Sequence, residues 1–177
     1  MSGLFYTYLD SPVGALLVAG DGNRLHFISF PTGHKTFGPR RDWQRHDAPF
    51  AEARRQLDAY FAGELKQFDL AYHLSGSGFQ NRVWEYLATI PYGETTTYGA
   101  IAKALGDPNA SRAVGTANGN NPLPILLPCH RVIGANGALT GFGGGLPTKK
   151  YLLKLENAWE EPPQADLFAG LIPRVND

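Results

Sequence analysis

The stretch 75–78, with the sequence SGSG, divides the chain into two parts with different patterns. Before it, short apolar runs are separated by Gly, Asn, Asp and Pro, which is typical of strands joined by tight turns. After it, apolar residues recur at helical spacing, beginning with Phe79, Val83, Trp84 and Leu87. A flexible Ser/Gly segment between two such parts is typical of a linker. The sequence therefore predicts an α+β fold, in which a sheet-forming part precedes a mainly helical part.

The first part predicts a small N-terminal antiparallel sheet. Runs over Leu4–Leu9, Ala15–Ala19 and Leu25–Phe30 are bounded by turn residues and favour hairpins. Residues 31–48 predict a polar loop with a solvated group of arginines. A further short strand over 67–72 would complete the sheet.

One helix is expected in this first part, from Pro49 to Ala62. Asp47 is a candidate cap, the proline suits the first turn, and the glycine at position 63 suits the end. The expected domains are residues 1–75 and residues 79–157, followed by an acidic tail over 158–177.

Two short helices around a tight turn follow in the second part. Thr97 can cap a helix over Tyr98–Leu105, and Asn109 can cap another over Ala110–Ala117. The sequence GDPN between them favours a sharp turn. Two helices joined in this way indicate a helix-turn-helix. An ordinary helical hairpin fits the same pattern equally well.

The second of these helices is unusual for a reader of DNA sequence. It carries one long cation, Arg112, and small residues at most other positions. Direct readout in the major groove usually needs several Arg, Gln or Asn side chains. A smooth helix with one arginine instead favours close approach to a groove, with that side chain inserted into the base stack. Tight helix–helix packing is the alternative explanation for the small residues.

Cys129 is the sole cysteine of the 177 residues and lies in the sequence Pro128-Cys129-His130-Arg131. The proline restricts its own backbone and that of the preceding residue, so the thiol is held on a stiff segment. A histidine can accept a proton near neutral pH, and a nearby cation lowers the pKa of a thiol. The pattern indicates a nucleophile, although a lone cysteine is more often a small buried apolar side chain.

Composition excludes several other classes of protein. One cysteine is too few for a disulfide framework and fits a reducing compartment. No apolar stretch is long enough to span a membrane, and the five histidines show no metal-ligand spacing. Residues 79–157 carry seven Lys/Arg against four Asp/Glu, which is weak support for DNA binding. A cytoplasmic protein without a metal site is expected.

The last patterned segment is a glycine-rich loop followed by a helix. The loop 141–145, with the sequence GFGGG, matches no nucleotide-binding spacing, so no cofactor is expected. It favours a lid or a wall close to a ligand slightly over a plain loop. The helix begins near Pro147 and ends near Glu156, with Tyr151, Leu152 and Leu155 expected to face inward.

The run from Gly119 to Val132, GNNPLPILLPCHRV, resembles the active-site signature of the O6-alkylguanine-DNA alkyltransferases. The similarity continues upstream through IPYG at 90–93 and SRAVG at 111–115, and downstream from Gly137 to Glu156. It covers residues 79–156 closely. Residues 1–75 resemble the less distinctive N-terminal domain of the same family.

The resemblance implies a chemical role for each matching residue. Cys129 would accept the alkyl group, His130 would act as a base through a water, and Glu156 would orient the imidazole. Asn121 would brace the turn before the cysteine. Tyr98 would help to rotate the nucleotide and would donate a proton to the guanine ring.

The resemblance also implies how the DNA and the base would be held. Arg112 would fill the gap left by a flipped base. The other DNA contacts would come from Thr97, Tyr98, Ser111, Ala113, Gly115 and Asn118. The substrate pocket would be formed by Arg131, Val132, Phe142 and Gly143, with backbone groups of Cys129 and Val132 holding the guanine.

Two of these pocket positions depart from the pattern of some family members. Phe142 stands where others have a tyrosine, so it keeps a stacking wall but lacks a hydroxyl. Gly143 stands where others have a serine, so only its backbone amide can bond the oxygen. Both changes make the pocket less polar or roomier, which leaves its substrate range open.

The implied activity is repair by direct alkyl transfer from O6-alkylguanine in duplex DNA to the cysteine, with O4-alkylthymine as a further candidate substrate. The base must leave the helix first, because its oxygen is unreachable in the stack. Nothing in the sequence would break the thioether product, so one turnover per molecule is expected. The expected partner is double-stranded DNA with alkylated bases, bound by a monomer without a cofactor.

Two alternatives stay open at this point. One is a cysteine hydrolase that uses Cys129, His130 and Glu156 and turns over repeatedly. The other is a non-catalytic damage sensor that binds DNA. The expected location is the cytoplasm, at the nucleoid in a bacterium, or the nucleus in a eukaryote.

Overall fold

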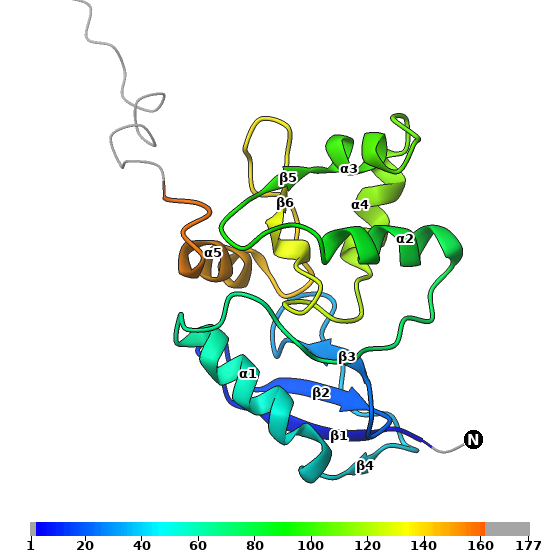
Figure 1. Ribbon diagram of the computed structural model, residues 1–177, viewed down its shortest axis with the longest axis vertical. Coiled ribbons are helices and arrows are strands. Elements are labelled where there is room, and N and C mark those ends of the chain that lie inside the picture. Colours follow the sequence, from blue (N-terminus) through cyan, green and yellow to red (C-terminus); the bar gives the residue numbers. More distant parts are fainter. Residues whose placement is uncertain (1–2, 162–177) are drawn as a thin grey trace, which may run out of the picture.

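The computed structural model describes residues 3–161, in which a twisted sheet and one helix lie below a group of helices (Figure 1). The strands of the sheet, in spatial order, are β3 (Leu25–Ser29), β2 (Leu16–Gly20), β1 (Phe5–Leu9) and β4 (Gln44–Arg45). The pairs β1–β2 and β2–β3 are antiparallel, as predicted. The edge strand β4 pairs with β1 in parallel, so the sheet is mixed.

Two predictions for this sheet are wrong in detail. The expected loop 31–48 contains β4, which has two exposed polar residues and therefore no apolar alternation that could indicate a strand. The expected strand over 67–72 forms a single bridge, between Leu25 and Tyr72. The side chain of Gln56 bonds both backbone groups of Asp69, at 2.8 and 2.9 Å, and so takes the place of a neighbouring strand.

The helix α1 (Ala51–Phe61) covers one face of the sheet and follows a single 3-10 turn, η1 (Ala48–Phe50). Asp47 precedes this turn, but its side chain caps no backbone N–H, contrary to the prediction. Its carboxylate instead accepts hydrogen bonds from the hydroxyl of Thr7 at 2.6 Å and from Nε of Arg45 at 2.9 Å. Asp47 therefore links the start of the helix to the sheet.

The second part is helical, with one small parallel strand pair. Its elements are α2 (Gly78–Leu87), β5 (Thr96–Thr97), α3 (Tyr98–Ala104), α4 (Ser111–Gly119), η2 (Cys129–Arg131), β6 (Val132–Ile133) and α5 (Leu146–Leu155). Strand β5 pairs with β6, which places the start of α3 beside the segment after the cysteine. Helices α3 and α4 pack together as the predicted helix-turn-helix pair.

The caps of these two helices differ from each other. The hydroxyl of Thr97 accepts a hydrogen bond from the backbone N–H of Ala100 at 3.1 Å, which confirms the predicted cap of α3. The predicted cap Asn109 is wrong, because α4 begins after Ala110 with no side-chain cap. Asn109 instead donates its backbone N–H to the side chain of Asp107, within the turn.

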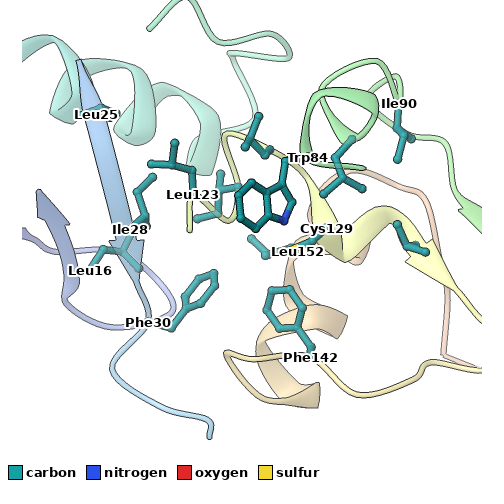
Figure 2. Close-up of a cluster of buried hydrophobic side chains, with 14 of the residues drawn as sticks. Leu16, Leu25, Ile28, Phe30, Trp84, Ile90, Leu123, Cys129, Phe142 and Leu152 are labelled. Carbon is teal, nitrogen blue, oxygen red and sulfur yellow. The ribbon is translucent and has the colours of Figure 1, made fainter. Parts of the chain in front are cut away.

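One hydrophobic core joins both parts of the chain (Figure 2). Leu16 and Ile28 enter it from the sheet, Trp84 from α2, and Leu123 from the segment before the cysteine. Cys129 lies in the same core. The nucleophile candidate is therefore placed by residues from the whole molecule.

Helix α5 buries Leu152 fully and Leu155 in part, as predicted, but the prediction for Tyr151 is wrong. Leu152 and Leu153 are fully buried, whereas Tyr151, which was expected to face inward, is 37% exposed. Lys149 of the same helix also points inward and is fully buried. Most of the predicted acidic tail lies beyond Glu161, outside the described residues. Within residues 3–161, every helix is too short or too polar to cross a membrane.

Candidate active site

A braced turn holds the cysteine. The amide Nδ2 of Asn121 donates to the carbonyl of Leu127 at 2.7 Å, and its Oδ1 accepts from the backbone N–H of Leu123 at 2.9 Å. Ile125, inside the turn, has φ +75°, a left-handed backbone that a β-branched residue rarely adopts. Such a conformation persists only where the surroundings fix it. Asn121 therefore occupies the bracing position that was predicted for it.

Cys129 begins the short turn η2 and is 4% exposed. Burial raises the pKa of its thiol to about 11, although a hydrogen bond from Asn121 and the charge of Lys149 act in the opposite direction. The prediction that an adjacent cation would activate the thiol is wrong for Arg131, which points elsewhere. The thiol therefore keeps its proton at neutral pH, and it needs a base to become a nucleophile.

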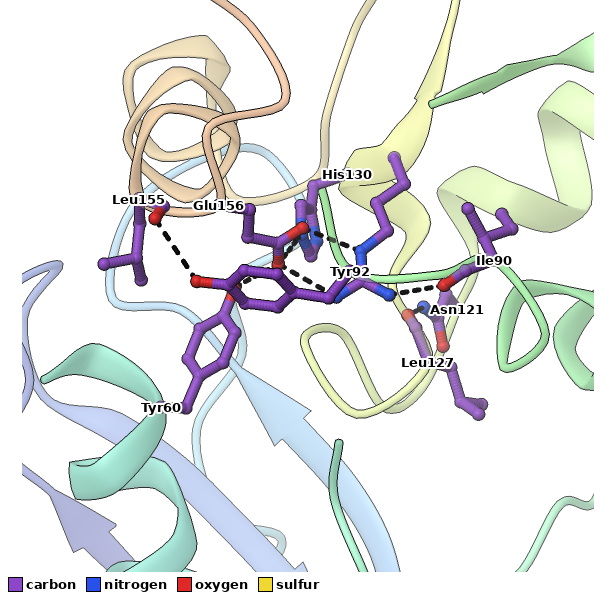
Figure 3. Close-up of polar contacts among 9 residues, drawn as sticks. Tyr60, Ile90, Tyr92, Asn121, Leu127, His130, Leu155 and Glu156 are labelled. Atoms are coloured by element: carbon purple, nitrogen blue, oxygen red, sulfur yellow. Dashed lines mark hydrogen bonds and ion pairs between the residues drawn. The ribbon is translucent and has the colours of Figure 1, made fainter. Parts of the chain in front are cut away.

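His130 is placed to be that base. It is fully buried, and its Nε2 lies 2.7 Å from Oε2 of Glu156 (Figure 3). Burial lowers the pKa of His130, with Glu156 acting in the opposite direction, so the ring is neutral at neutral pH. Its Nδ1 has no hydrogen-bond partner among residues 3–161. With Nε2–H donating to the carboxylate, Nδ1 carries the lone pair that accepts a proton.

Glu156 follows α5 and accepts hydrogen bonds from three side chains. Besides His130, its Oε2 accepts from the hydroxyl of Tyr60 at 2.5 Å and from Nη2 of Arg131 at 3.0 Å. Its Oε1 accepts from Nε of Arg131 at 2.8 Å. Burial alone would raise the pKa of Glu156, but the bonds from His130, Arg131 and Tyr60 hold it at about 2. The carboxylate is therefore ionised and fixed.

The structure places Arg131 outside the predicted substrate pocket. Its guanidinium is bound by Glu156 and donates from Nη1 to the carbonyl of Ile90 at 2.5 Å. The residue is 6% exposed and does not line the cavity beside Cys129. A buried guanidinium needs a carboxylate, and Glu156 supplies it. The prediction of Arg131 as a pocket residue is therefore wrong.

A small cavity, partly open to solvent, lies beside the cysteine. The residues that line it include Phe30, Lys35, Asn121, Cys129, Phe142 and Gly143. The Phe142 ring lies 5.5 Å from that of Phe30, so it forms the expected apolar wall. The backbone N–H of Lys35 donates to the carbonyl of Gly143 at 3.2 Å. The contribution of residues 30–37 was missed, because no local pattern shows which distant loop will pack against the site.

Gly143 allows this close approach of the two loops. A Cβ added at Gly143 would lie 2.8 Å from the side chain of Lys35, and one added at Gly33 would lie 2.1 Å from the carbonyl oxygen of Gly143. The second contact is with backbone and cannot be relieved by a side-chain rotation. The glycines at 33 and 143 therefore let the N-terminal part reach the wall of the cavity.

Val132 and Lys149 form a second buried contact near the cysteine. The Nζ of Lys149 donates to the carbonyl of Val132 at 2.6 Å, so the backbone group predicted to hold guanine already has a partner. Val132 itself does not line the cavity. Burial lowers the pKa of Lys149 to about 8, and the thiol of Cys129 acts in the opposite direction. Lys149 was not predicted, because two adjacent lysines on a helix normally point into solvent.

Tyr98 lies at the start of α3, where its hydroxyl is 2.5 Å from Oγ1 of Thr140. Gly115 of α4 lies against the same ring, since a Cβ added there would come within 3.6 Å of it. Tyr98 does not line the cavity beside Cys129. It therefore connects the helix pair to the loop that forms the cavity wall.

The predicted DNA-binding residues divide into two groups. Arg112 and Ala113 are exposed on α4, and Ser111, Gly115 and Thr97 are half-buried beside them. Asn118 is different, because it is 5% exposed and its Nδ2 donates to the carbonyl of Cys129 at 3.4 Å. It lines the cavity, so the prediction that it contacts DNA is wrong, since it lies on the inner face of α4.

Among residues 3–161, no group of His, Cys, Asp and Glu could hold a metal ion.

Protein-family models match both parts of the chain. Residues 78–158 match the DNA binding domain of 6-O-methylguanine DNA methyltransferase, and residues 4–74 match its ribonuclease-like domain. A methylated-DNA–protein-cysteine methyltransferase of Methanosarcina acetivorans is 52% identical over 155 residues, which is 88% of this chain and 99% of that protein. A Mycobacterium tuberculosis protein of the same name is 49% identical over 166 residues, 93% of this chain and 99% of that protein.

Crystal structures of related proteins have the same fold. Mycobacterium tuberculosis OGT in complex with DNA gives a TM-score of 0.82 at 49% identity, covering 93% of this chain and 99% of that chain. The O6-methylguanine-DNA methyltransferase of the hyperthermophilic archaeon Pyrococcus kodakaraensis gives a TM-score of 0.62 at 25% identity, covering 86% and 98%. This chain therefore belongs to the O6-methylguanine-DNA methyltransferase family.

Proposed function

We propose that Cys129 is the alkyl acceptor of this protein and that it reacts once. The protein is a methylated-DNA–protein-cysteine methyltransferase, which repairs O6-alkylguanine in DNA. The observation that carries the assignment of the acceptor is the geometry of η2. A buried thiol and a neutral imidazole are adjacent in one turn, and an ionised carboxylate holds the far nitrogen of that imidazole.

The transfer is a displacement at the alkyl carbon. The thiol of Cys129 gives its proton to Nδ1 of His130, through a water, and Glu156 stabilises the imidazolium that forms. The sulfur then forms a bond to the alkyl carbon as the bond from that carbon to O6 of guanine breaks. The electron pair of the broken bond stays on the guanine, which takes up one proton. The products are guanine and a thioether, which this site has no group to cleave.

Quenching the charge on the leaving guanine is the second requirement, because an oxygen anion leaves poorly. Tyr98 is our candidate donor. Its phenol is held by Thr140 at the edge of the loop that carries Phe142, on the side of the molecule where α3 and α4 lie. We propose that the guanine ring of a nucleotide rotated out of the duplex lies against this hydroxyl while its alkyl group reaches the cavity.

The α4 surface supplies the means of rotating that nucleotide. Arg112 is its long exposed side chain, and Ala113 beside it allows close approach to the minor groove. We propose that the guanidinium of Arg112 occupies the space left by the flipped base. Unstacking costs a few kcal/mol and costs least for a poorly paired base, which favours damaged over normal guanine.

Double-stranded DNA with alkylated bases is the proposed partner, and the protein is proposed to act as a monomer wherever the DNA is kept. That place is the cytoplasm and nucleoid of a bacterium, or the nucleus of a eukaryote. The separate matches to residues 4–74 and 78–158 support a division into two domains near residues 75–78.

The test is the stoichiometry of repair. The protein is incubated with an excess of duplex containing one O6-methylguanine, and guanine formed is counted per protein molecule. One repaired base per molecule, then a plateau, is expected. Continued turnover would indicate a hydrolase-like reaction, and binding without any repair would indicate a damage sensor; either result would contradict the proposal.

A further inference from the structure

Tyr60 is the N-terminal side chain that reaches the catalytic carboxylate. It lies on α1, far from Glu156 in the sequence, and it is fully buried. Its hydroxyl donates to Oε2 of Glu156 at 2.5 Å, the same oxygen that lies 2.7 Å from Nε2 of His130 (Figure 3). A phenol carries one hydrogen, so this contact uses all of its donor capacity.

We propose that Tyr60 is a positioning residue through which the N-terminal part orients Glu156 and, through Glu156, the imidazole of His130. The proposal rests on the role assigned to His130 above. Tyr60 lies outside residues 79–156, which carry the family signature, and it does not line the cavity that contains Cys129. Its effect on the reaction must therefore pass through the carboxylate.

The packing of Tyr60 makes it a rigid support. Its ring packs against Phe61, Phe68 and Tyr92, with centroids 5.3, 5.3 and 6.4 Å away. Burial raises the pKa of Tyr60 strongly, and the neighbouring Glu156 raises it further, so the phenol stays a donor at every pH that the protein tolerates. A neutral donor held by three rings fixes one oxygen of the carboxylate without adding a charge.

The other charged and titratable groups around this cluster come from three further elements. Arg131 of η2 binds both oxygens of Glu156, Lys149 of α5 lies near the thiol, and Tyr92 follows α2. The two cations act against protonation of His130, and Glu156 favours it. Removing the Tyr60 hydroxyl leaves Arg131 in place to hold the carboxylate, while Oε2 presents more of its charge to His130.

The expected result is a shift in the protonation of His130. In Tyr60→Phe, the imidazole should titrate at higher pH than in the wild type. Alkyl transfer at neutral pH should then be slower by roughly three- to tenfold. The reason is that losing one hydrogen bond to the charged Glu156 raises the fraction of His130 that is protonated, and protonated His130 cannot accept the proton of the thiol. The rate should recover as the pH is raised. A merely structural role would lower stability but would leave the pH profile where it was.

Tyr92→Phe is the matched control. The Tyr92 hydroxyl donates to the backbone carbonyl of Leu155 at 3.3 Å, and the residue lies next to Tyr60 without bonding Glu156 (Figure 3). This variant removes the same atom from the same cluster. It should leave both the His130 titration and the pH profile unchanged.

The experiment follows the His130 imidazole by NMR in ¹⁵N-histidine-labelled full-length protein, and measures transfer rates across pH in parallel. An upward shift in Tyr60→Phe alone is expected. No shift, a downward shift, or an equal shift in both variants would overturn the proposal. The titration needs no repair activity, so a wild type that fails to transfer would contradict the proposed function separately.

A second substitution covers the case in which Tyr60→Phe does not fold. Difluorotyrosine at position 60 keeps the ring and the hydroxyl but makes the phenol a stronger donor. The His130 titration should then move to lower pH than in the wild type. An unchanged or raised value in that protein would count against the proposal.

Discussion

The site around Glu156 and the surface of α4 are built in opposite ways. At Glu156, every partner is buried, and one carboxylate is fixed by three side chains from α1 and η2. On α4, one arginine is exposed on a helix of small residues. The first region depends on the placement of buried groups around one carboxylate, which has three side-chain partners. The second depends on shape and on one side chain.

This difference predicts that substitutions in the two regions have different effects. Changes around Glu156 should alter chemistry and folding together, because burying a charge without its partner is costly. Changes on α4 should alter only the reaction with duplex DNA. Substitutions that broke this rule would show that the two regions are more closely coupled than the structure indicates.

The largest effect is expected from Cys129→Ser. Transfer should fall by more than about 10³-fold, because a hydroxyl is a far weaker acid and nucleophile than a thiol. Affinity for duplex DNA should be unchanged, since the exposed surface of α4 is not altered. Single-turnover kinetics and a binding isotherm measure the two quantities. Loss of binding by a normally folded variant would contradict the separation of the two regions.

Glu156→Gln should have the next largest effect. Transfer should fall by roughly 10²-fold as the imidazole loses its orienting charge. The free energy of unfolding should fall by about 3 kcal/mol, because Arg131 is left buried without its counter-ion. Urea unfolding and single-turnover rates check both values.

Glu52→Gln is the control for that stability loss. Glu52 pairs with Arg55 on the exposed face of α1, where both side chains are more than half exposed. Such pairs contribute between about 0 and 1 kcal/mol. If Glu52→Gln lowered the free energy of unfolding as much as Glu156→Gln, burial would not be the reason why the Glu156 site stabilises the fold.

Wild type and Glu156→Gln should also differ in how their stability depends on pH. Glu156 has a folded-state pKa of about 2 against its ordinary value of 4.5, so its contribution to stability is complete above about pH 5. The contribution, about 3 kcal/mol, is lost as the pH falls toward 2. The stability difference between wild type and Glu156→Gln should therefore shrink over that range. A constant difference from pH 7 to pH 3 would contradict the lowered pKa.

The smallest effect is expected from Arg112→Ala. Repair of duplex DNA should slow by about tenfold, or about 1.4 kcal/mol, which is part of the few kcal/mol that unstacking a base costs. Reaction with a free O6-alkylated base should be unchanged, because no stacking gap then needs to be filled. Arg54→Ala, which removes an exposed arginine from α1, should change neither rate. Equal slowing on both substrates would reject the wedge role.

Much of this architecture could be predicted from local patterns. The strand runs in residues 4–30, the Thr97 cap and the helix pair α3–α4 follow from spacing and turn residues. The bracing role of Asn121 and the pairing of His130 with Glu156 agree with what the family signature implies. These features depend on residues close in sequence or on a long, specific motif.

The errors share a different cause. Arg131 was predicted to line the substrate pocket and Asn118 to contact DNA, but both side chains point into the protein. No role was predicted for Tyr60 or Lys149. In each case the deciding contact joins distant segments through a buried hydrogen bond. Sequence pattern indicates which face of a helix is apolar, but not which polar group that face will meet.

The most direct test of the central claim is the mass of the protein after reaction. Protein is incubated with duplex DNA containing one O6-methylguanine, digested, and analysed by mass spectrometry. The prediction is one methyl group on the peptide that contains Cys129, in an amount equal to the guanine formed. Guanine formed without any gain in protein mass, or a methyl group on another residue, would contradict it.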